Sequence, residues 1–347
     1  MRFRAAILNS QKKAPRILGA FFLASALALL PACRKSGTPD WEAGQKPTDV
    51  STAGGAAPKT EAKPVTKRAP APSSEGLRFV SYNVQNWLTM ERRKEGKVIG
   101  KIPKPENEKK AVIDLLTRHS PDIVGLCEVG SAADLAELRE RLKAAGVDLP
   151  HSHYTGGSDP TRHLGLLSRF PILSTAKPVE TEFRLAGQTF AINRGILDAT
   201  VDVRGKPYRF VGVHLKSKRE SEQGDQEAMR LHEARLLRRH LDSIFKSDPD
   251  VRLVVYGDMN DTPSTPVIKT VTGRNRSPES LIALPLKDSR KMAWTHHWAL
   301  HDIYSRVDFV MVAKPLRKNV DLSSSKVIDD EDWDVASDHR PVLAVFK

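Results

Sequence analysis

Six short polar segments lie where predicted β-strands begin or end. Their side chains are mostly carboxylates, amides and imidazoles, the groups that bind cations and move protons. Because polar residues at strand ends tend to gather at one rim of a sheet, we expect them to form a single site. The segments are Ser81–Asn86, Leu126–Val129, Val213–Ser217, Gly257–Asp261, Arg306–Phe309 and Ser337–Val342.

The carboxylates among these segments favour chemistry at a hard divalent cation. A phosphodiester is an anion that repels anionic nucleophiles, and a bound Mg²⁺-class ion relieves that repulsion. Mg²⁺ takes oxygen ligands and keeps several waters, so one or two carboxylates suffice. No cysteine-rich or histidine-rich cluster suggests zinc. We therefore expect Mg²⁺, with Mn²⁺ or Ca²⁺ as alternatives, near Glu128, Asp258, Asp308 and Asp338.

Together and in this order, the six segments resemble the endonuclease/exonuclease/phosphatase superfamily. That family includes pancreatic-type deoxyribonuclease, exonuclease III-like enzymes, neutral sphingomyelinases and inositol-phosphate 5-phosphatases. The resemblance covers residues 77–347. It implies a divalent-metal-dependent phosphodiesterase. The mixture of strands and helices independently suggests an α/β fold in which two mixed sheets pack face to face with helices outside, a four-layer sandwich.

The resemblance also implies roles for individual residues. Glu128 would be the principal metal ligand, helped by Asn83, and Asp338 would join the metal shell. Asp258 would position or activate the attacking water, and Asn260 would hold the scissile phosphate.

Two histidines complete the implied set. His339 would pair with Asp308, whose carboxylate favours the charged imidazole. The sequence leaves open whether His339 is a general base or a phosphate-binding cation. His214 would contact the phosphate or the leaving group. Taken singly, each of these residues would more often be a turn former or a packed polar residue, and the ordered set outweighs that interpretation.

Several basic and aromatic residues near these segments are weaker candidates. Phosphate binding is an option for Arg194, Lys216 and Lys218, and for Arg162. The basic stretch from Glu91 to Lys110 is expected to be a loop leaving the rim of the site. Loop packing is favoured over substrate contact for the run from Trp294 to Trp298, and Cys127 is expected to be a small buried strand residue.

The amino terminus is predicted to be a targeting signal rather than part of the folded domain. Residues 1–32 hold five basic residues, no acids and an apolar run from Ile17 to Leu30. That run is too short to span a bilayer and fits a signal peptide. It ends in Leu30-Pro31-Ala32-Cys33, which resembles a bacterial lipobox and implies lipidation at Cys33. An ordinary secretory signal is the alternative.

Composition divides the remaining chain into a tether and a catalytic domain. Residues 33–75 are rich in Pro, Ala, Gly, Thr and Lys, which predicts a disordered linker. Residues 76–347 form the predicted catalytic domain. Its helices are expected at 107–119, 132–145 and 226–245, and its strands at 77–84, 122–127, 164–168, 194–203, 208–215, 251–256, 307–312 and 341–346.

Charge constrains the substrate only weakly. The chain of 347 residues has a net charge of +13, but residues 76–347 carry 43 basic and 37 acidic residues, a net of +6. An extracytoplasmic, lipid-anchored, monomeric nuclease acting on DNA or RNA is the first hypothesis, with no protein partner inferred. A phospholipid or sphingolipid phosphodiesterase is the second, although no long apolar loop suggests lipid insertion. An inactive polyanion-binding module is the third.

Overall fold

A computed structural model of the chain describes residues 76–347 except 95–96, 179 and 220–223. The predicted signal peptide, the lipidation candidate Cys33 and the predicted linker lie outside the described residues. Within the described range, no helix combines the length and apolar character that a membrane span requires.

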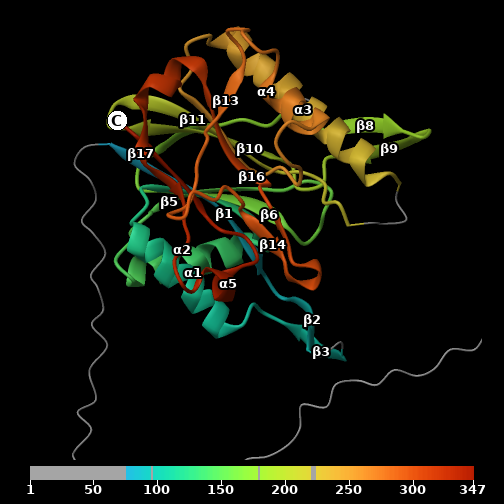
Figure 1. Cartoon of the computed structure of the whole chain (residues 1–347), viewed down its shortest axis with the longest axis vertical. Helices are drawn as coiled ribbons and strands as arrows, with labels where there is room; N and C mark the ends of the chain where they lie inside the picture. The colour runs from blue at the N-terminus through green and yellow to red at the C-terminus, as the bar shows by residue number, and fades with distance from the viewer. Residues whose placement is uncertain (1–75, 95–96, 179, 220–223) are drawn as a thin grey trace, which may run out of the picture. The chain divides into compact units, whose positions relative to one another are not determined.

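Two six-stranded mixed sheets form the centre of the fold (Figure 1). The first runs in the order β17 (Val320–Val327), β18 (Val342–Phe346), β1 (Leu77–Trp87), β4 (Ile123–Val129), β6 (His163–Ser168) and β5 (His151–Thr155). The second runs in the order β13 (Leu281–Ala283), β16 (Asp308–Ala313), β12 (Leu253–Asp258), β11 (Lys206–His214), β10 (Ile196–Val203) and β7 (Ile172–Thr175).

The inner faces of the two sheets share one hydrophobic core. Phe79 lies at its centre, with its ring centroid 5.0 Å from that of Phe210 and 4.9 Å from that of Tyr256. Tyr256 fits only because glycines face it: a Cβ added to Gly125 would lie 2.0 Å from its ring, and one added to Gly212 2.5 Å from its hydroxyl. This packing brings the strand ends of the two sheets close together.

Helices cover the two outer faces. On the first sheet lie α1 (Glu106–His119) and α2 (Ala132–Ala144), and on the second lie α3 (Gln226–Ser247) and α4 (Pro266–Thr272). A short helix, α5 (Trp333–Ala336), precedes the last polar segment. Ser131 and Asp134 form a capping box that starts α2 where the sequence places it. The predicted four-layer α/β sandwich is confirmed.

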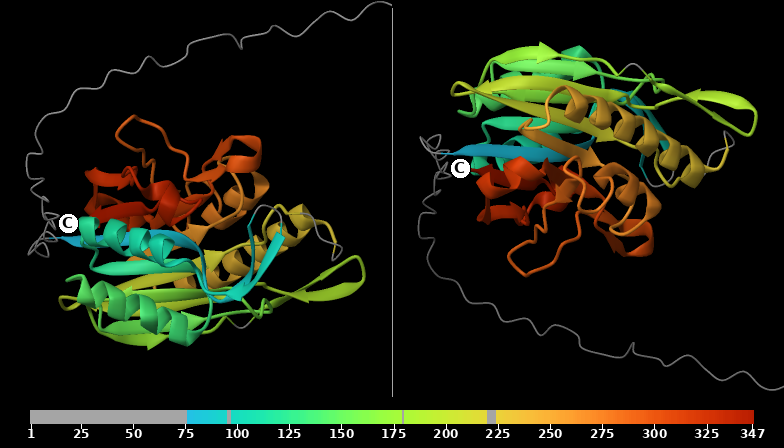
Figure 2. Two further views of the ribbon diagram at one scale, coloured as in Figure 1. Left: turned by 90° about the horizontal axis from the view of Figure 1, so that it is seen from below. Right: turned by 90° about the horizontal axis from the view of Figure 1, so that it is seen from above.

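Three two-stranded hairpins extend from this sandwich. They are β2 (Met90–Lys94) with β3 (Lys97–Ile102), β8 (Glu182–Leu185) with β9 (Gln188–Ala191), and β14 (His296–Trp298) with β15 (Ile303–Ser305). In Figure 2 the β2–β3 and β8–β9 hairpins project on the side away from the carboxyl terminus. The expectation of a loop from Glu91 to Lys110 was wrong. An exposed ribbon buries neither face, so its strands lack the apolar alternation that identifies a strand.

Candidate active site

Two strands of the second sheet end and a third begins at one edge of that sheet, which brings three site residues side by side. The register pairs His214 of β11 with Asp258 of β12, and Asp258 with Asp308 of β16. Paired residues of neighbouring strands project to the same face of a sheet, so the three side chains face one space. Gly257 permits this ending: its φ is +124°, and a Cβ there would lie 2.0 Å from the Val213 carbonyl oxygen.

The first sheet contributes Asn83 from β1 and Glu128 from β4. The β4 pairing with both neighbours shifts register around Glu128, whose φ is +66°. A bulge of this kind re-aims a side chain, and a non-glycine residue with positive φ carries backbone strain. The Glu128 carboxylate turns toward β1, where it accepts the Asn86 backbone N–H at 2.9 Å and the Asn83 amide at 3.5 Å.

His339 and Asp308 form a buried pair. The Nδ1 of His339 lies 2.8 Å from Oδ2 of Asp308, and both side chains are more than nine-tenths buried. Burial opposes a charge on the imidazole, but Asp308 and then Asp258 outweigh it and hold the pKa of His339 well above its usual value. His339 is therefore an imidazolium at neutral pH, with its Nε2 3.4 Å from the Asn83 amide nitrogen and 3.7 Å from Asp258.

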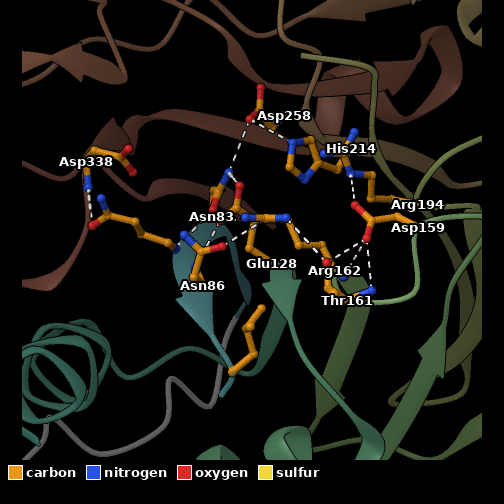
Figure 3. A network of polar contacts seen from close by, with 12 residues as sticks. Asn83, Asn86, Glu128, Asp159, Thr161, Arg162, Arg194, His214, Asp258 and Asp338 are labelled. Atoms are coloured by element: carbon orange, nitrogen blue, oxygen red, sulfur yellow. Dashed lines mark hydrogen bonds and ion pairs between the residues drawn. The ribbon is translucent and has the colours of Figure 1, made fainter. Parts of the chain in front are cut away.

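Asp258 is the carboxylate at the centre of the site. Its Oδ2 accepts the Asn83 amide at 3.2 Å and lies 3.5 Å from Nε2 of His214, while its Oδ1 accepts the Asn260 backbone N–H at 2.8 Å (Figure 3). Burial raises the pKa of Asp258 to about 7, against the opposing charge of His339. A carboxylate with a pKa near neutrality can take up and release a proton at physiological pH.

Two other expected site residues lie at the edge of this cluster. The Asn260 side chain donates to the Leu215 carbonyl at 2.9 Å, which fixes the loop after β12. Asp338 has a side chain 38% exposed, and its backbone N–H donates to the Gln85 side chain at 3.2 Å. The side chain of Asp338 is thus open to solvent beside the rim, in contrast to the buried Asp258.

Two groups of side chains could hold a cation by distance alone, and both contain His339. One group adds Asp258 and Asp308, and the other adds His296 and Asp338. The Nδ1 of His339 already faces Asp308, so in each group His339 has only its Nε2 left for a cation.

Glu128 and Asn83 fit a hard cation better. Glu128 is an oxygen donor held open toward the site, and the exposed carboxylate of Asp338 is a third oxygen source. Asn83 presents its amide nitrogen to the carboxylates and its oxygen to the Gln85 N–H. Ligation through that oxygen therefore requires the amide to turn over when a cation binds.

Four basic side chains, here called the cationic edge, border the site on the side of His214 and Glu128. Arg162 donates to the Asn86 side chain at 2.8 Å and lies 3.9 Å from Glu128. The other three are Arg194, Lys216 and the exposed Lys218, whose ammonium lies 3.1 Å from Asp261. Figure 3 shows Asp159 between Arg162 and Arg194: its carboxylate pairs with the Arg194 guanidinium and accepts the backbone N–H of Arg162.

The run from Trp294 to Trp298 leads into a hairpin of residues 296–305, here called the aromatic hairpin. The sequence predicted the packing of this run only in part. The expected loop packing is confirmed for Trp294, on which the Arg340 guanidinium lies 3.3 Å from the ring centroid, and for the buried Thr295. Trp298 is instead 49% exposed.

The aromatic hairpin also reaches the catalytic cluster. The His296 ring lies 4.5 Å from that of His339, and the His297 N–H donates to the Asp338 carbonyl at 3.0 Å. Sequence reasoning missed this contact because an isolated backbone bridge joins the hairpin to a segment 43 residues away in the chain. The aromatic and histidine-rich composition of the run was the available signal.

Comparisons with known proteins agree with this geometry. The Endonuclease/Exonuclease/phosphatase family profile matches residues 73–328. A search of curated protein sequences gives no match. Similar solved structures include the human nocturnin catalytic domain with bound sulfate (19% identity, TM-score 0.56, covering 78% of this chain and 94% of that one). A sphingomyelinase C from Streptomyces griseocarneus (15%, 0.52, 79% and 100%) and a 3′ phosphatase from Neisseria bound to a product DNA hairpin (15%, 0.54, 78% and 99%) share the fold.

These identities establish the fold alone, whereas the profile match spans most of the chain. The family's members hydrolyse phosphoester bonds and are generally dependent on a divalent metal, which agrees with the oxygen-rich rim described above. The chain therefore belongs to the endonuclease/exonuclease/phosphatase family.

Proposed function

We propose that this protein is a divalent-metal-dependent nuclease that hydrolyses phosphodiester bonds in DNA or RNA. The cationic edge carries the proposal. It comprises four cations, from Arg162, beside Glu128, to Lys218, beside Asp261, which is more than one phosphate needs. Several cations at one edge suit a substrate with repeating phosphates, because such contacts are made to the backbone rather than to bases.

In this proposal Glu128, Asn83 and Asp338 hold the cation. When bound, it neutralises a phosphate oxygen and the charge that develops on it. The buried Asp258 accepts the proton of the attacking water, since its pKa of about 7 matches that task. Asp308 pairs with His339 and favours its charged form, which supports a phosphate-binding role for the imidazolium over that of a general base.

His214 and Asn260 assist at the edge of the reaction. Burial, with the charges of Arg194 and His339, lowers the pKa of His214 well below its usual value, so its imidazole is neutral. A neutral imidazole can donate a hydrogen bond to the phosphate or leaving group without adding charge. Asn260 holds the scissile phosphate, which requires its amide to leave the Leu215 carbonyl.

A substrate panel tests the proposed function. The purified protein is assayed on single-stranded and duplex DNA, on RNA and on bis-p-nitrophenyl phosphate, with Mg²⁺, with Mn²⁺ and with EDTA. We expect nucleic-acid cleavage that EDTA abolishes and added metal restores. Hydrolysis of the small diester without cleavage of any nucleic acid would reject the nuclease assignment while leaving the phosphodiesterase chemistry intact.

The exposed face of the aromatic hairpin favours a second candidate, a phospholipid or sphingolipid phosphodiesterase. Leu300 is 81% exposed, Trp298 49% and Ile303 47%. This exposed apolar tip weakens the expectation that the chain lacks a loop suited to lipid. The three residues are not consecutive in the sequence, and the hairpin brings them together. Release of phosphocholine from sphingomyelin vesicles tests this candidate. Leu300→Asp should reduce that release at least tenfold and spare soluble substrates.

We also propose that the enzyme acts outside the cytoplasm, anchored by a lipid at Cys33 as a monomer. The basic start, apolar run and small-residue cleavage segment before Cys33 support this proposal. Membrane fractionation of cells producing the full chain tests it. Cys33→Ser should move the protein to the soluble fraction or leave an unprocessed precursor, and an unchanged distribution of mature protein would contradict anchoring.

A further inference from the structure

Arg194 is a buried cation whose guanidinium pairs with one carboxylate but keeps a donor without a hydrogen-bond partner among the described residues. Its side chain is 9% exposed, and its Nε faces Oδ2 of Asp159 at 3.3 Å. Its Nη1 is buried and has no hydrogen-bond partner among the described residues. Leaving a buried donor unpaired costs free energy, and more so when the group is charged. A fold that keeps such a group beside an active site has a place for a ligand to satisfy it.

A second buried cation lies next to Arg194. Lys216 is 8% exposed, and its backbone N–H donates to the buried Glu233 at 2.6 Å. The backbone N–H groups of Asn193 and Lys216 both donate to the Glu233 carboxylate, so Lys216 lies close to the residue that precedes Arg194. Burial, and then the charge of Arg194, lower the pKa of Lys216. An anion bound beside two such cations is attracted by both of them.

His214 connects this pair to the reaction centre. Figure 3 shows Asp258, His214, Arg194 and Asp159 in that order along the site. The His214 Nε2 faces Asp258 at 3.5 Å, and its buried Nδ1 also has no partner within the described part of the chain. His214 therefore separates Arg194 from Asp258, which places Arg194 where it suits the phosphate next to the scissile one.

We propose that Arg194 and Lys216 form a subsite for a second, non-scissile phosphate of the substrate. The ligand is the phosphate that neighbours the cleaved one in a polynucleotide. Arg194 contributes a fixed fork of donors, oriented by Asp159, and Lys216 contributes a compact charge. This inference rests on the proposed nuclease function and narrows it, because a lipid with a single phosphodiester cannot fill the subsite.

Matched oligonucleotides test the subsite. The substrates are a dinucleoside monophosphate, which has one phosphodiester, and the same molecule with an added 5′-phosphate or 3′-phosphate. In the wild type, kcat/KM should be about tenfold to a hundredfold higher for at least one phosphorylated form, the range expected for a hydrogen bond to a charged group. In Arg194→Gln and in Lys216→Gln that ratio should fall toward one.

The ratio of two substrates on one variant cancels any general loss of folded enzyme. Lys206→Gln is the matched control, since Lys206 lies on β11 at the end away from His214. It should keep the wild-type ratio. If the wild type shows no preference, or if Arg194→Gln keeps the preference, the subsite is overturned.

A binding measurement separates this inference from the proposed function. Calorimetry compares thymidine 3′,5′-bisphosphate with thymidine 5′-monophosphate and 3′-monophosphate, with and without Mg²⁺. Binding of the bisphosphate at least tenfold tighter by the wild type, lost in Arg194→Gln and kept in Lys206→Gln, supports the subsite even if no nucleic acid is cleaved. Equal affinities for the bisphosphate and both monophosphates reject it even if the protein is a nuclease.

Discussion

Replacing Asp308 with Asn tests the electrostatic role of the buried pair with His339. The substitution keeps the shape and an oxygen acceptor for Nδ1 of His339, 2.8 Å away, but removes the negative charge. For charges about 4 Å apart at an effective dielectric of about 20, the lost attraction is ~4 kcal/mol. Because each pKa shift expresses a free-energy difference between the two protonation states, the loss of this attraction should lower the pKa of His339.

The consequence is a neutral imidazole at the pH of the assay. Burial already disfavours the charged form of His339, and without Asp308 only Asp258 and the more distant Asp338 still favour it. With phosphate binding by the imidazolium lost, kcat should fall about 100- to 1000-fold at pH 7.5, equivalent to ~3–4 kcal/mol of transition-state stabilisation. Part of the activity should return as the pH is lowered.

Initial rates on bis-p-nitrophenyl phosphate between pH 5.5 and 9, with saturating Mg²⁺, measure this change. Nuclear magnetic resonance titration of the His339 ring measures its protonation directly in wild type and variant. Because the pKa of His339 is raised in the fold, the pair's stabilisation is full below pH ~6.5 and is lost as the pH rises through the folded value. A rate within threefold of wild type at pH 7.5, or a ring that stays protonated in the variant, refutes the reasoning.

Three further predictions concern other parts of the site. Asp258→Asn should abolish turnover yet stabilise the metal-free fold by about 1–3 kcal/mol in urea melts at pH 8, because burial raises the pKa of Asp258 to about 7. The gain in stability should vanish near pH 4, where the carboxyl is protonated in the fold. A loss of stability at pH 8 would contradict the prediction. Gly257→Ala should destabilise the protein by about 3 kcal/mol, owing to its φ of +124° and the contact with Val213, and a midpoint equal to wild type would rule out this strain. In thermal unfolding scans, Mg²⁺ at 100 times its Kd should stabilise the wild type by about 2.7 kcal/mol. The stability of Glu128→Gln should not change when Mg²⁺ is added at the same concentration.

The sequence predicted the strands that bury an apolar face in the core and missed strands that are largely exposed. The strands at 77–84 and 251–256 have apolar runs that the core requires, and both appear in the structure. The β2–β3 hairpin and β17 do not follow the pattern, because their strands are largely exposed and their order comes from pairing with a neighbour.

From the sequence, only the gathering of the site residues at strand ends could be predicted. Motif order indicated which carboxylates and histidines share a rim, and the register of His214, Asp258 and Asp308 brings those three together. The sequence could not show that Arg194 is buried with an unpaired donor, since that depends on how its loop packs against α3 and Asp159. Nor could it show that His339 is charged and His214 neutral, because burial and neighbours set those states.

The direction of β1 determines what a tethered form of this domain could reach. Strand β1 begins at Leu77, beside the carboxyl-terminal strand, and Asn83 lies six residues further along it, roughly 20 Å away at ~3.3 Å per residue. An attachment through the amino terminus, as proposed for Cys33, would therefore join the domain at the end of β1 opposite the catalytic rim. A short attachment at that end would leave the rim open to soluble polymers and would oppose the inversion that a lipid in the same membrane requires. Shortening the tether should thus leave polymer cleavage unchanged and suppress cleavage of lipid.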